Sequence, residues 1–210
     1  MIKRPDGKAW RFVRGKRPTH ESGEHDVDAV WVKEVALYIS EAWRSAAGGV
    51  LVLMTSYLDQ QAVGKELAVQ ADIGPIIVQK SGRPLGSCHA AFLEAVAVGK
   101  RPLMLGVGGA WTGLDLHTPS FPNALTDLVI PLIPFGAAGQ PAGGRQSLTN
   151  VTYAAYILLR QGLGRVVRSP ETPANRRIHL LDVRRHMDEF AGMCQPINRW
   201  LARYSNQVRV

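Results

Sequence analysis

The sequence predicts an α/β domain with a parallel sheet, and two observations support this fold class. From about residue 50 onwards, short apolar segments without periodicity alternate with longer segments of helical periodicity. Continuous apolar segments are expected for strands covered on both faces, and their alternation with helices is typical of a parallel sheet with crossover helices. With 210 residues, 46% of them hydrophobic, the chain can also bury a substantial core. These features exclude a disordered chain and a disulfide-stapled miniprotein.

The amino-terminal residues differ in composition from the rest of the chain. Residues 1–25 are rich in Lys, Arg, Pro and Gly and show no sustained hydrophobic period, so we expect a basic arm or interdomain linker there and one domain over residues 26–210. Trp10 and Phe12 lie among basic residues, a pattern suited to single-stranded nucleic acid or phosphates. Two alternatives stay open: the charges are simply solvated, or the arm is ordered only beside a partner domain.

Hydrophobic periodicity predicts the elements of the domain. Apolar residues recur at spacings of three and four from Val27 to Ala47, which predicts a helix with one buried face that ends at Gly48 and Gly49. Trp31 and Trp43 fall on this face and are predicted core residues. The later predicted strands are Val50–Met54, Pro75–Val78, Pro102–Val107, Leu128–Ile133 and Ile178–Leu181, and the predicted helices are Leu58–Gln70, Ser87–Val98, Thr152–Gly162, Val183–Ala191 and Pro196–Tyr204.

Charge and cysteine content narrow the class of protein. The chain has 25 Lys and Arg against 17 Asp and Glu, a formal net charge of +8, which is typical of proteins with polyanionic partners. Cys88 and Cys194 are too few and too far apart for a zinc site or an iron–sulfur cluster, so no metal site is expected within this sequence. No apolar stretch is long enough for a membrane span, and no signal peptide is evident. We therefore expect a cytoplasmic protein without a membrane partner.

The segment from Gln161 to Arg168 is the richest in candidate chemistry. It follows an apolar helical segment, Tyr153 to Leu159. If the helix continues, Gln161, Arg165 and Arg168 stand at positions i, i+4 and i+7. One amide and two guanidinium groups then project from a single face, which favours the binding of phosphate groups. The alternative is a solvated basic helix end that is stabilised by the helix macrodipole.

This segment, Gln-Gly-Leu-Gly-Arg-Val-Val-Arg, fits the pattern Q-x-x-G-R-x-x-R and resembles motif VI of superfamily 2 helicases, in the form found in the DinG and XPD branch. Four other segments resemble that branch and occur in its order, so the resemblance covers most of the predicted domain. Ala110 and Thr112 stand where motif V of the branch usually has Phe and Glu. Residues 49–57 are similar to motif IV, and residues 110–116 are similar to motif V. Residues 128–135 are similar to the strand that follows motif V, and residues 178–184 are similar to a late Leu-Asp-x-Arg segment.

The resemblance implies a RecA-like sheet with helices on both faces, and specifically the second of two RecA-like domains. Such domains bind ATP in the cleft between them and hold single-stranded DNA across their shared top. The phosphate-binding pattern G-x-x-x-x-G-K-[ST] does not occur in this sequence. ATP and Mg²⁺ would therefore be held mainly by an N-terminal RecA-like ATPase domain, and we expect little or no ATP hydrolysis from this chain alone.

The resemblance also implies roles for single residues on the nucleotide side. Arg165 and Arg168 would act as arginine fingers on the β- and γ-phosphates, and Gln161 would orient a phosphate or the attacking water. A loop after residue 112 would link DNA contact to the nucleotide cleft. For Asp115 in this loop, a plain turn residue remains the alternative. The further residues on the nucleotide side would be Gly113, Asp115 and Gly164.

On the DNA side, the resemblance points to residues that follow predicted strands. Thr55 and Ser56 offer hydroxyl and backbone N–H groups to a phosphate, and Tyr57 offers a ring for stacking on a base. The alternative is that Thr55 and Ser56 cap the helix that begins near Leu58. Trp111, in a Gly-rich segment, is the tryptophan expected to stack on a base.

The leading hypothesis is that the chain is the C-terminal motor domain of an ATP-dependent DNA helicase, with unwinding in the 5′ to 3′ direction. A CRISPR-associated member of the DinG branch, with a ribonucleoprotein partner, is one form of this hypothesis. A second hypothesis is a non-catalytic RecA-like module that binds nucleic acid or protein and has no ATPase activity. A third is a translocase that remodels proteins on DNA without unwinding it.

Overall fold

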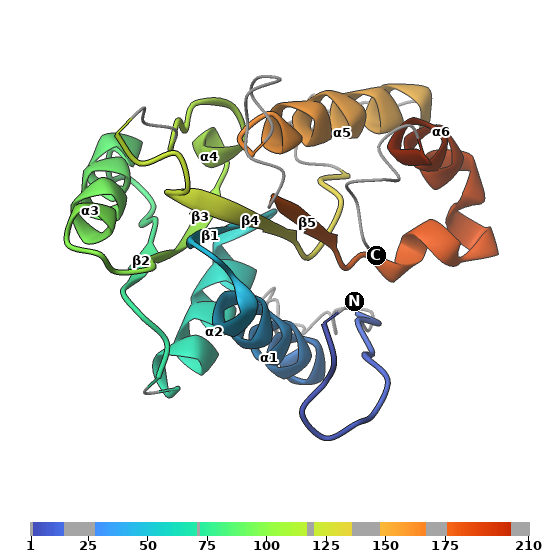
Figure 1. Cartoon of the computed structure of the whole chain (residues 1–210). Coiled ribbons are helices and arrows are strands. Elements are labelled where there is room, and N and C mark those ends of the chain that lie inside the picture. The colour runs from blue at the N-terminus through green and yellow to red at the C-terminus, as the bar shows by residue number, and fades with distance from the viewer. Residues whose placement is uncertain are drawn as a thin grey trace.

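The computed structural model describes residues 2–14, 28–70, 72–116, 120–135, 148–166 and 176–202. Five parallel strands form one sheet in the order β2-β3-β1-β4-β5, with helices on both faces (Figure 1). The predicted fold class is therefore confirmed. The strands are β1 (Gly49–Met54), β2 (Ile76–Val78), β3 (Leu103–Val107), β4 (Leu125–Ile130) and β5 (Arg177–Leu180). The helices are α1 (Ala29–Ser45), α2 (Tyr57–Ala68), α3 (Leu85–Ala97), α4 (Gly109–Thr112), α5 (Leu148–Leu163) and α6 (Ala191–Leu201), with 3₁₀ helices η1 (Val183–His186) and η2 (Asp188–Phe190).

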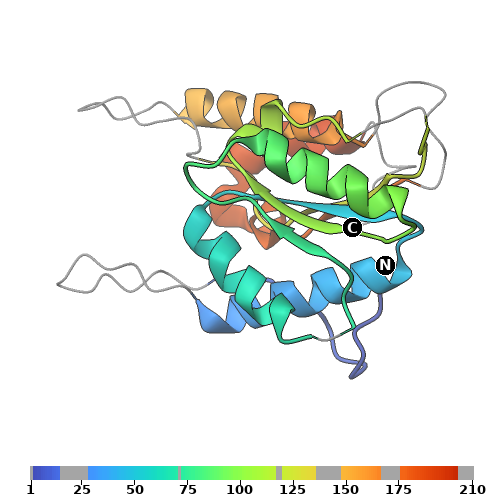
Figure 2. The same ribbon diagram turned by 90° about the vertical axis from the view of Figure 1, so that its left-hand side faces the viewer.

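The central strand β1 is buried along its whole length. Leu51 and Leu53 pack into a core with α3, α4, α5 and α6, whereas Val50 and Val52 pack into a second core with α1 and α2. Figure 2 shows these two helical layers on either side of the sheet. Because both faces are covered, every position of the strand is apolar, which is why its sequence has no period of two.

The first helix agrees closely with its prediction. Asp28 precedes α1 and its carboxylate accepts hydrogen bonds from two backbone N–H groups of the first turn, which fixes the start of the helix. Trp31 and Trp43 are buried, as predicted. Gly48 does not itself end the helix. It allows the backbone to approach residue 123 closely, because a Cβ at Gly48 would lie 2.0 Å from the carbonyl oxygen of Asn123.

Several elements near the carboxyl end differ from their predictions. β4 ends at Ile130 rather than at residue 133 because Pro131 has no N–H to donate to the sheet. The predicted helix over residues 183–191 is divided into η1 and η2, and α6 begins at Ala191 with Pro196 inside it. The short helix α4 was not predicted, since one turn is too short to show a period. Within the described ranges, the helices are too short or too polar to cross a membrane.

Residues 2–14, the described part of the predicted arm, pack against α1. The guanidinium group of Arg4 lies 2.6 Å from the carboxylate of Glu34, which is itself buried. The rings of Trp10 and Phe12 stack at 5.7 Å, and both meet the ring of Tyr38 edge-on. These two aromatic residues therefore complete the core over α1, which leaves the nucleic-acid interpretation of their rings without support. The predicted boundary at residue 25 lies outside the described residues.

Candidate nucleotide and nucleic-acid sites

The hydroxyl pair after β1 begins α2. Ser56 has extended backbone, its Oγ accepts a hydrogen bond from the backbone N–H of Asp59 (3.1 Å), and it donates to the Asp59 carboxylate (2.8 Å). Ser56 is therefore a helix cap, as the alternative interpretation proposed. Thr55 and Tyr57 are both half-buried at the same strand end. The contact of these three residues with DNA stays a prediction.

A buried glutamine, which the sequence did not single out, connects three strand ends. Gln79 follows β2, and its side-chain amide nitrogen lies 3.4 Å from the Tyr57 hydroxyl. Its amide oxygen accepts a hydrogen bond from the backbone N–H of Val107, the last residue of β3 (2.9 Å). Gln79 thus fixes the Tyr57 hydroxyl relative to the carboxyl ends of β2 and β3. Only the position of Gln79 directly after a predicted strand could have drawn attention to it.

Asp59 also receives a cation from the arm. A terminal nitrogen of Arg14 lies 2.6 Å from the Asp59 carboxylate, which is buried, and the guanidinium carbon lies 5.0 Å from the centre of the Trp31 ring. A buried carboxylate without a partner is costly, so this ion pair balances the charge beneath the Ser56 cap. The arm therefore supports the strand end that was predicted to bind DNA.

Trp111 lies in the core, and the prediction that it stacks on a base is wrong for this structure. Its side chain is 2% exposed. Its indole N–H donates to the backbone carbonyl of Met54, the last residue of β1 (2.9 Å). The ring packs beside Gly162, where an added Cβ would come within 3.0 Å of it. The sequence suggested an exposed loop, but the segment forms α4 and turns the indole inward.

The helix that carries the arginine motif ends before Arg165. α5 ends at Leu163, and residues 164–166 form turns in which the backbone N–H of Arg165 donates to the carbonyl of Gly162 (3.0 Å). The prediction of one continuous helical face from Gln161 through Arg165 is therefore wrong. Gln161 is exposed on the last turn of α5, and Gly164 is half-buried. Arg168 lies outside the described residues.

The guanidinium group of Arg165 is bound to the predicted coupling loop. One terminal nitrogen donates to the carbonyl of Leu114 (2.7 Å) and the other to the carbonyl of Thr112. These two carbonyls flank Gly113, whose own N–H donates to the carbonyl of Gly109 (2.7 Å). Asp115, the next residue, is exposed. The structure thus brings Arg165 and Gly113 together, two residues that the sequence assigned to the nucleotide side from different segments.

A buried polar network links α1 to β5 and β4. The Tyr38 hydroxyl lies 3.0 Å from Nδ1 of His179, and Nε2 of His179 lies 3.0 Å from the carboxylate of Asp127. Burial alone would raise the pKa of Asp127, but hydrogen bonds from His179, Thr126 and Arg177 hold it below the ordinary value of 3.8. Burial raises the pKa of Tyr38 to about 12. The side chains of Tyr38, His179 and Asp127 are buried, and their hydrogen bonds hold β4 and β5 to α1.

The late Leu-Asp-x-Arg segment joins the ends of β4 and β5. The Asp182 carboxylate accepts hydrogen bonds from the backbone N–H of Ile133 (2.7 Å) and from the Arg184 side chain (2.6 Å). Arg184 also donates to the carbonyl of Ile133 (3.1 Å) and lies over the ring of Phe135. The Asp and Arg of this segment therefore hold the chain that leaves β4.

The parallel sheet, with helices on both faces, is a RecA-like α/β fold. Residues 39–195 match the family model described as Helicase C-terminal domain, and because this is more than half of the chain, the chain belongs to that family. No curated protein matches the sequence significantly.

Solved structures of XPD helicases share the fold. The structure named XPD_Helicase has a TM-score of 0.59 and 19% identity, and the match covers 82% of this chain and 32% of that chain. For XPD_APO the TM-score is 0.56 and the identity is 17%, and the match covers 80% of this chain and 35% of that chain. For the Xpd4 structure from S. tokodaii the TM-score is 0.50 and the identity is 18%, and the match covers 77% of this chain and 32% of that chain. The chain therefore spans about a third of the length of these XPD chains.

Proposed function

We propose that this chain is the second motor domain of an ATP-dependent DNA helicase of the DinG and XPD type. ATP is held by an N-terminal RecA-like domain, and Arg165, Arg168 and Gln161 act on it from this chain. The observation that carries the proposal is the binding of the Arg165 guanidinium group across the loop that carries Gly113. The guanidinium group is planar and permanently charged, and the two carbonyls fix where this charge lies relative to the loop.

The contacts also suggest how ATP and DNA affect one another. Thr112, whose carbonyl accepts from Arg165, is the last residue of α4, and Trp111 in the same helix donates to Met54 at the end of β1. Thr55 and Ser56 directly follow Met54 in the chain. A shift of Arg165 toward a phosphate would therefore act on α4 and, through Trp111, on the strand end proposed to bind DNA. This chain of contacts is the proposed connection between ATP turnover and movement on DNA.

The chemistry of the residues fits the phosphate-facing half of such a site. Arginine fingers neutralise the charge that develops on a departing phosphoryl group and increase the rate by about 10³ to 10⁵. We assign the Mg²⁺ that accompanies ATP to the other domain, since the described residues contain no group of three or more metal-ligating side chains. The role of this chain is then charge neutralisation and orientation, not the initial binding of the nucleotide.

The decisive experiment measures ATP turnover in the protein that joins this chain to a P-loop domain, with single-stranded DNA present. Arg165→Ala should reduce kcat by about 10³ or more while DNA affinity changes little. Arg165→Lys keeps the charge but loses the two-carbonyl contact, so it should also be strongly impaired. The matched control is Arg160→Ala, an exposed residue of α5. Normal turnover in Arg165→Ala would remove the arginine-finger assignment.

A second experiment tests the DNA surface and the direction of movement. Binding of single-stranded DNA should weaken with salt, with a logarithmic slope of about −0.7 for each phosphate contact. Replacement of Tyr57 by Ala should cost about 1 to 3 kcal/mol of binding if its ring stacks on a base. Substrates with a 5′ tail should be unwound and those with a 3′ tail should not. If the joined protein binds DNA without ATP turnover in any variant, a non-catalytic binding module is the function instead.

A further inference from the structure

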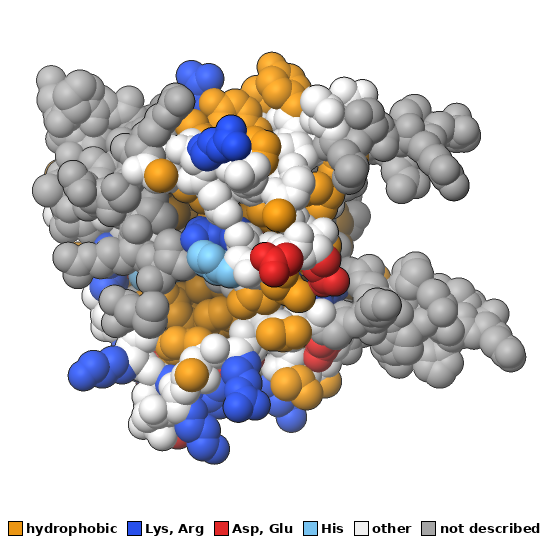
Figure 3. All heavy atoms as spheres, turned by 90° about the vertical axis from the view of Figure 1, so that its right-hand side faces the viewer, with side chains coloured by type: hydrophobic (Ala, Val, Ile, Leu, Met, Phe, Trp, Pro, Cys, Tyr) orange, Lys and Arg blue, Asp and Glu red, His pale blue; other side chains and the backbone are white. Residues whose placement is uncertain are grey.

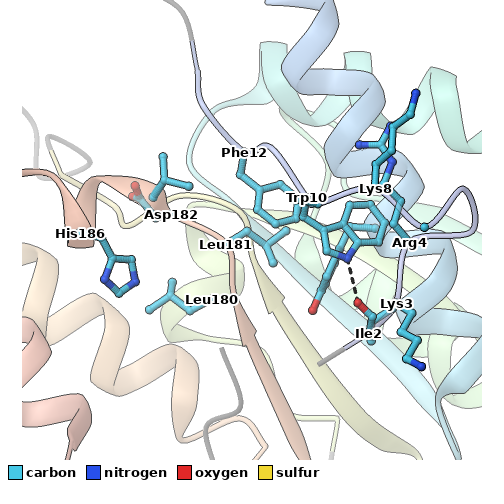
Figure 4. A pocket seen from close by; sticks show the side chains of 14 residues that line it. Ile2, Lys3, Arg4, Lys8, Trp10, Phe12, Leu180, Leu181, Asp182 and His186 are labelled. Carbon is cyan, nitrogen blue, oxygen red and sulfur yellow. Dashed lines mark hydrogen bonds between the residues drawn. The ribbon is translucent and has the colours of Figure 1, made fainter.

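A groove lies between the arm and the end of β5, and none of Gln161, Arg165 and Gly113 lines it. It has a volume of about 710 Å³, and its lining is mainly apolar. Figure 3 shows hydrophobic side chains gathered in this region, with basic side chains beside them. Figure 4 shows the arm on one side and the segment after β5 on the other. Its apolar lining includes Ile2, Trp10, Phe12, Tyr38, Leu180 and Leu181.

The position of the groove favours an extended occupant. β5 is the edge strand of the sheet and pairs with β4 on one side, and no described strand pairs with its other side. An exposed strand edge presents backbone donors and acceptors that an extended chain can use. Leu180, the last residue of β5, and Leu181 form part of the groove. A chain lying along the groove would therefore pass the end of this edge.

The charges around the groove favour an acidic occupant. The Lys3 and Lys8 side chains line it, are exposed, and form no ion pair with any residue that the structure describes. Among the described lining residues, Asp182 is the one acidic residue, and the side chain of Arg184 balances its charge at 2.6 Å. The described part of the groove therefore combines an apolar floor with two ammonium groups, and its one carboxylate is balanced by an arginine, so its charge favours an anion.

The aromatic side chains favour a polypeptide over a nucleic acid. The ring of Trp10 stacks on Phe12, meets Tyr38 edge-on at 4.9 Å, and has the guanidinium carbon of Arg4 5.6 Å from its centre. Its indole N–H already donates to the carbonyl of Ile2 (2.8 Å). A base would have to displace these partners in order to stack, whereas aliphatic side chains need only the apolar surface that lines the groove.

We propose that this groove binds an extended segment of a partner protein that is apolar on one face and acidic at its border. Apolar side chains of the segment enter between Trp10 and Phe12 on one side and Leu180 and Leu181 on the other. Acidic side chains face Lys3 and Lys8. This inference does not depend on ATP hydrolysis or on DNA binding, so its test is independent of the motor function.

In the experiment, a display library of short random peptides is selected for binding to the full chain. Fluorescence anisotropy then measures the affinity of the selected peptides. The enriched peptides should combine alternating apolar residues with Asp or Glu. The double variant Lys3→Glu/Lys8→Glu should weaken their binding by about tenfold, since it replaces two attractive contacts with two repulsive ones. Both residues are exposed, so the fold is not at risk. Ile2→Glu should also weaken peptide binding, because it places a carboxylate on the apolar floor of the groove.

The matched control is Lys65→Glu/Lys100→Glu, which makes the same change in net charge at exposed positions that do not line the groove. This variant should bind the peptides as the unchanged chain does. Bound peptide should slow amide hydrogen exchange near residues 2–12 and 180–183. The proposal is overturned by any of four results: no enrichment of acidic and apolar peptides, equal loss in both double variants, exchange protection elsewhere, or oligothymidylate that binds the groove more tightly than the peptides do.

Discussion

One terminal nitrogen of Arg165 lies 2.7 Å from the carbonyl oxygen of Leu114, and the other terminal nitrogen donates to the carbonyl of Thr112. The two acceptors stand on either side of Gly113, so the guanidinium group closes a short loop from the side. In sequence, the arginine is far from this loop, and only the packing of α4 beside α5 brings them together. The same contact therefore shapes the loop and places the charge of Arg165.

The first prediction concerns the coupling loop. Arg165→Ala removes two hydrogen bonds from a charged donor to backbone carbonyls, so residues 112–116 should exchange their amide hydrogens faster. The global free energy of unfolding should fall by about 1 to 2 kcal/mol, because the group is only half-buried. Hydrogen exchange with mass spectrometry measures the first effect and urea unfolding the second. Arg160→Ala, five residues earlier in the chain, should show neither effect, and unchanged exchange in Arg165→Ala would contradict the loop-closing role.

The second prediction separates Trp111 from DNA binding. Trp111→Phe removes the hydrogen bond to Met54 and leaves a buried carbonyl without its donor, so it should cost about 1 to 3 kcal/mol of stability. The affinity for single-stranded DNA should stay nearly unchanged, because the ring is buried. Urea unfolding and anisotropy of labelled oligonucleotides measure the two effects. A large loss of DNA affinity in a variant of normal stability would restore the stacking interpretation.

The sequence predicted the layers of the fold well because its strands are buried on both faces. In β1 and β3 every residue is buried, and such strands appear as unbroken apolar segments. The boundaries were less predictable where single residues decide them. Pro131 ends β4 earlier than hydropathy indicated, and α4, with four residues, is too short for a pattern.

The candidate sites were predictable only in part, since side-chain direction depends on packing. Ser56 was placed correctly at a strand end, and its capping role follows from its residue type. Arg165 was predicted to continue a helix, but Gly164 lies where the helix has already ended. The contacts of Gln79 and Arg14 join segments that are distant in sequence, and no local pattern indicates such contacts.

The third prediction is a dependence of stability on alkaline pH that arises from Tyr38. Burial raises the pKa of its hydroxyl from 10.0 to about 12, so the folded state holds this proton more tightly than the unfolded state does. The contribution of the protonated Tyr38 hydroxyl to the free energy of unfolding is therefore fully present below pH 10. It is lost as the pH rises toward 12. Tyr38→Phe should remove this part of the pH dependence.

Near neutral pH the same variant should be less stable by about 1 to 3 kcal/mol, because His179 loses a buried hydrogen-bond partner. Urea unfolding at a series of pH values compares the two chains. Tyr153→Phe is the control, since that tyrosine is 66% exposed and should leave the curve unchanged. Identical alkaline slopes for Tyr38→Phe and the unchanged chain would show that the proton is held elsewhere.

The fourth prediction concerns the close packing of α5 on the sheet. A Cβ at Gly162 would lie 2.9 Å from a methyl carbon of Leu53 and 3.0 Å from the ring of Trp111. Gly162→Ala should therefore destabilise the domain by about 1 to 3 kcal/mol through overpacking, although alanine is the better helix former. Gly192, in α6, has no atom within 4 Å of such a Cβ. Gly192→Ala should therefore leave stability unchanged or increase it by as much as about 1 kcal/mol. Urea unfolding compares the two substitutions, and equal effects would mean that α5 shifts freely over β1. In that case Trp111 would not hold α4 and α5 in a fixed relation to the end of β1.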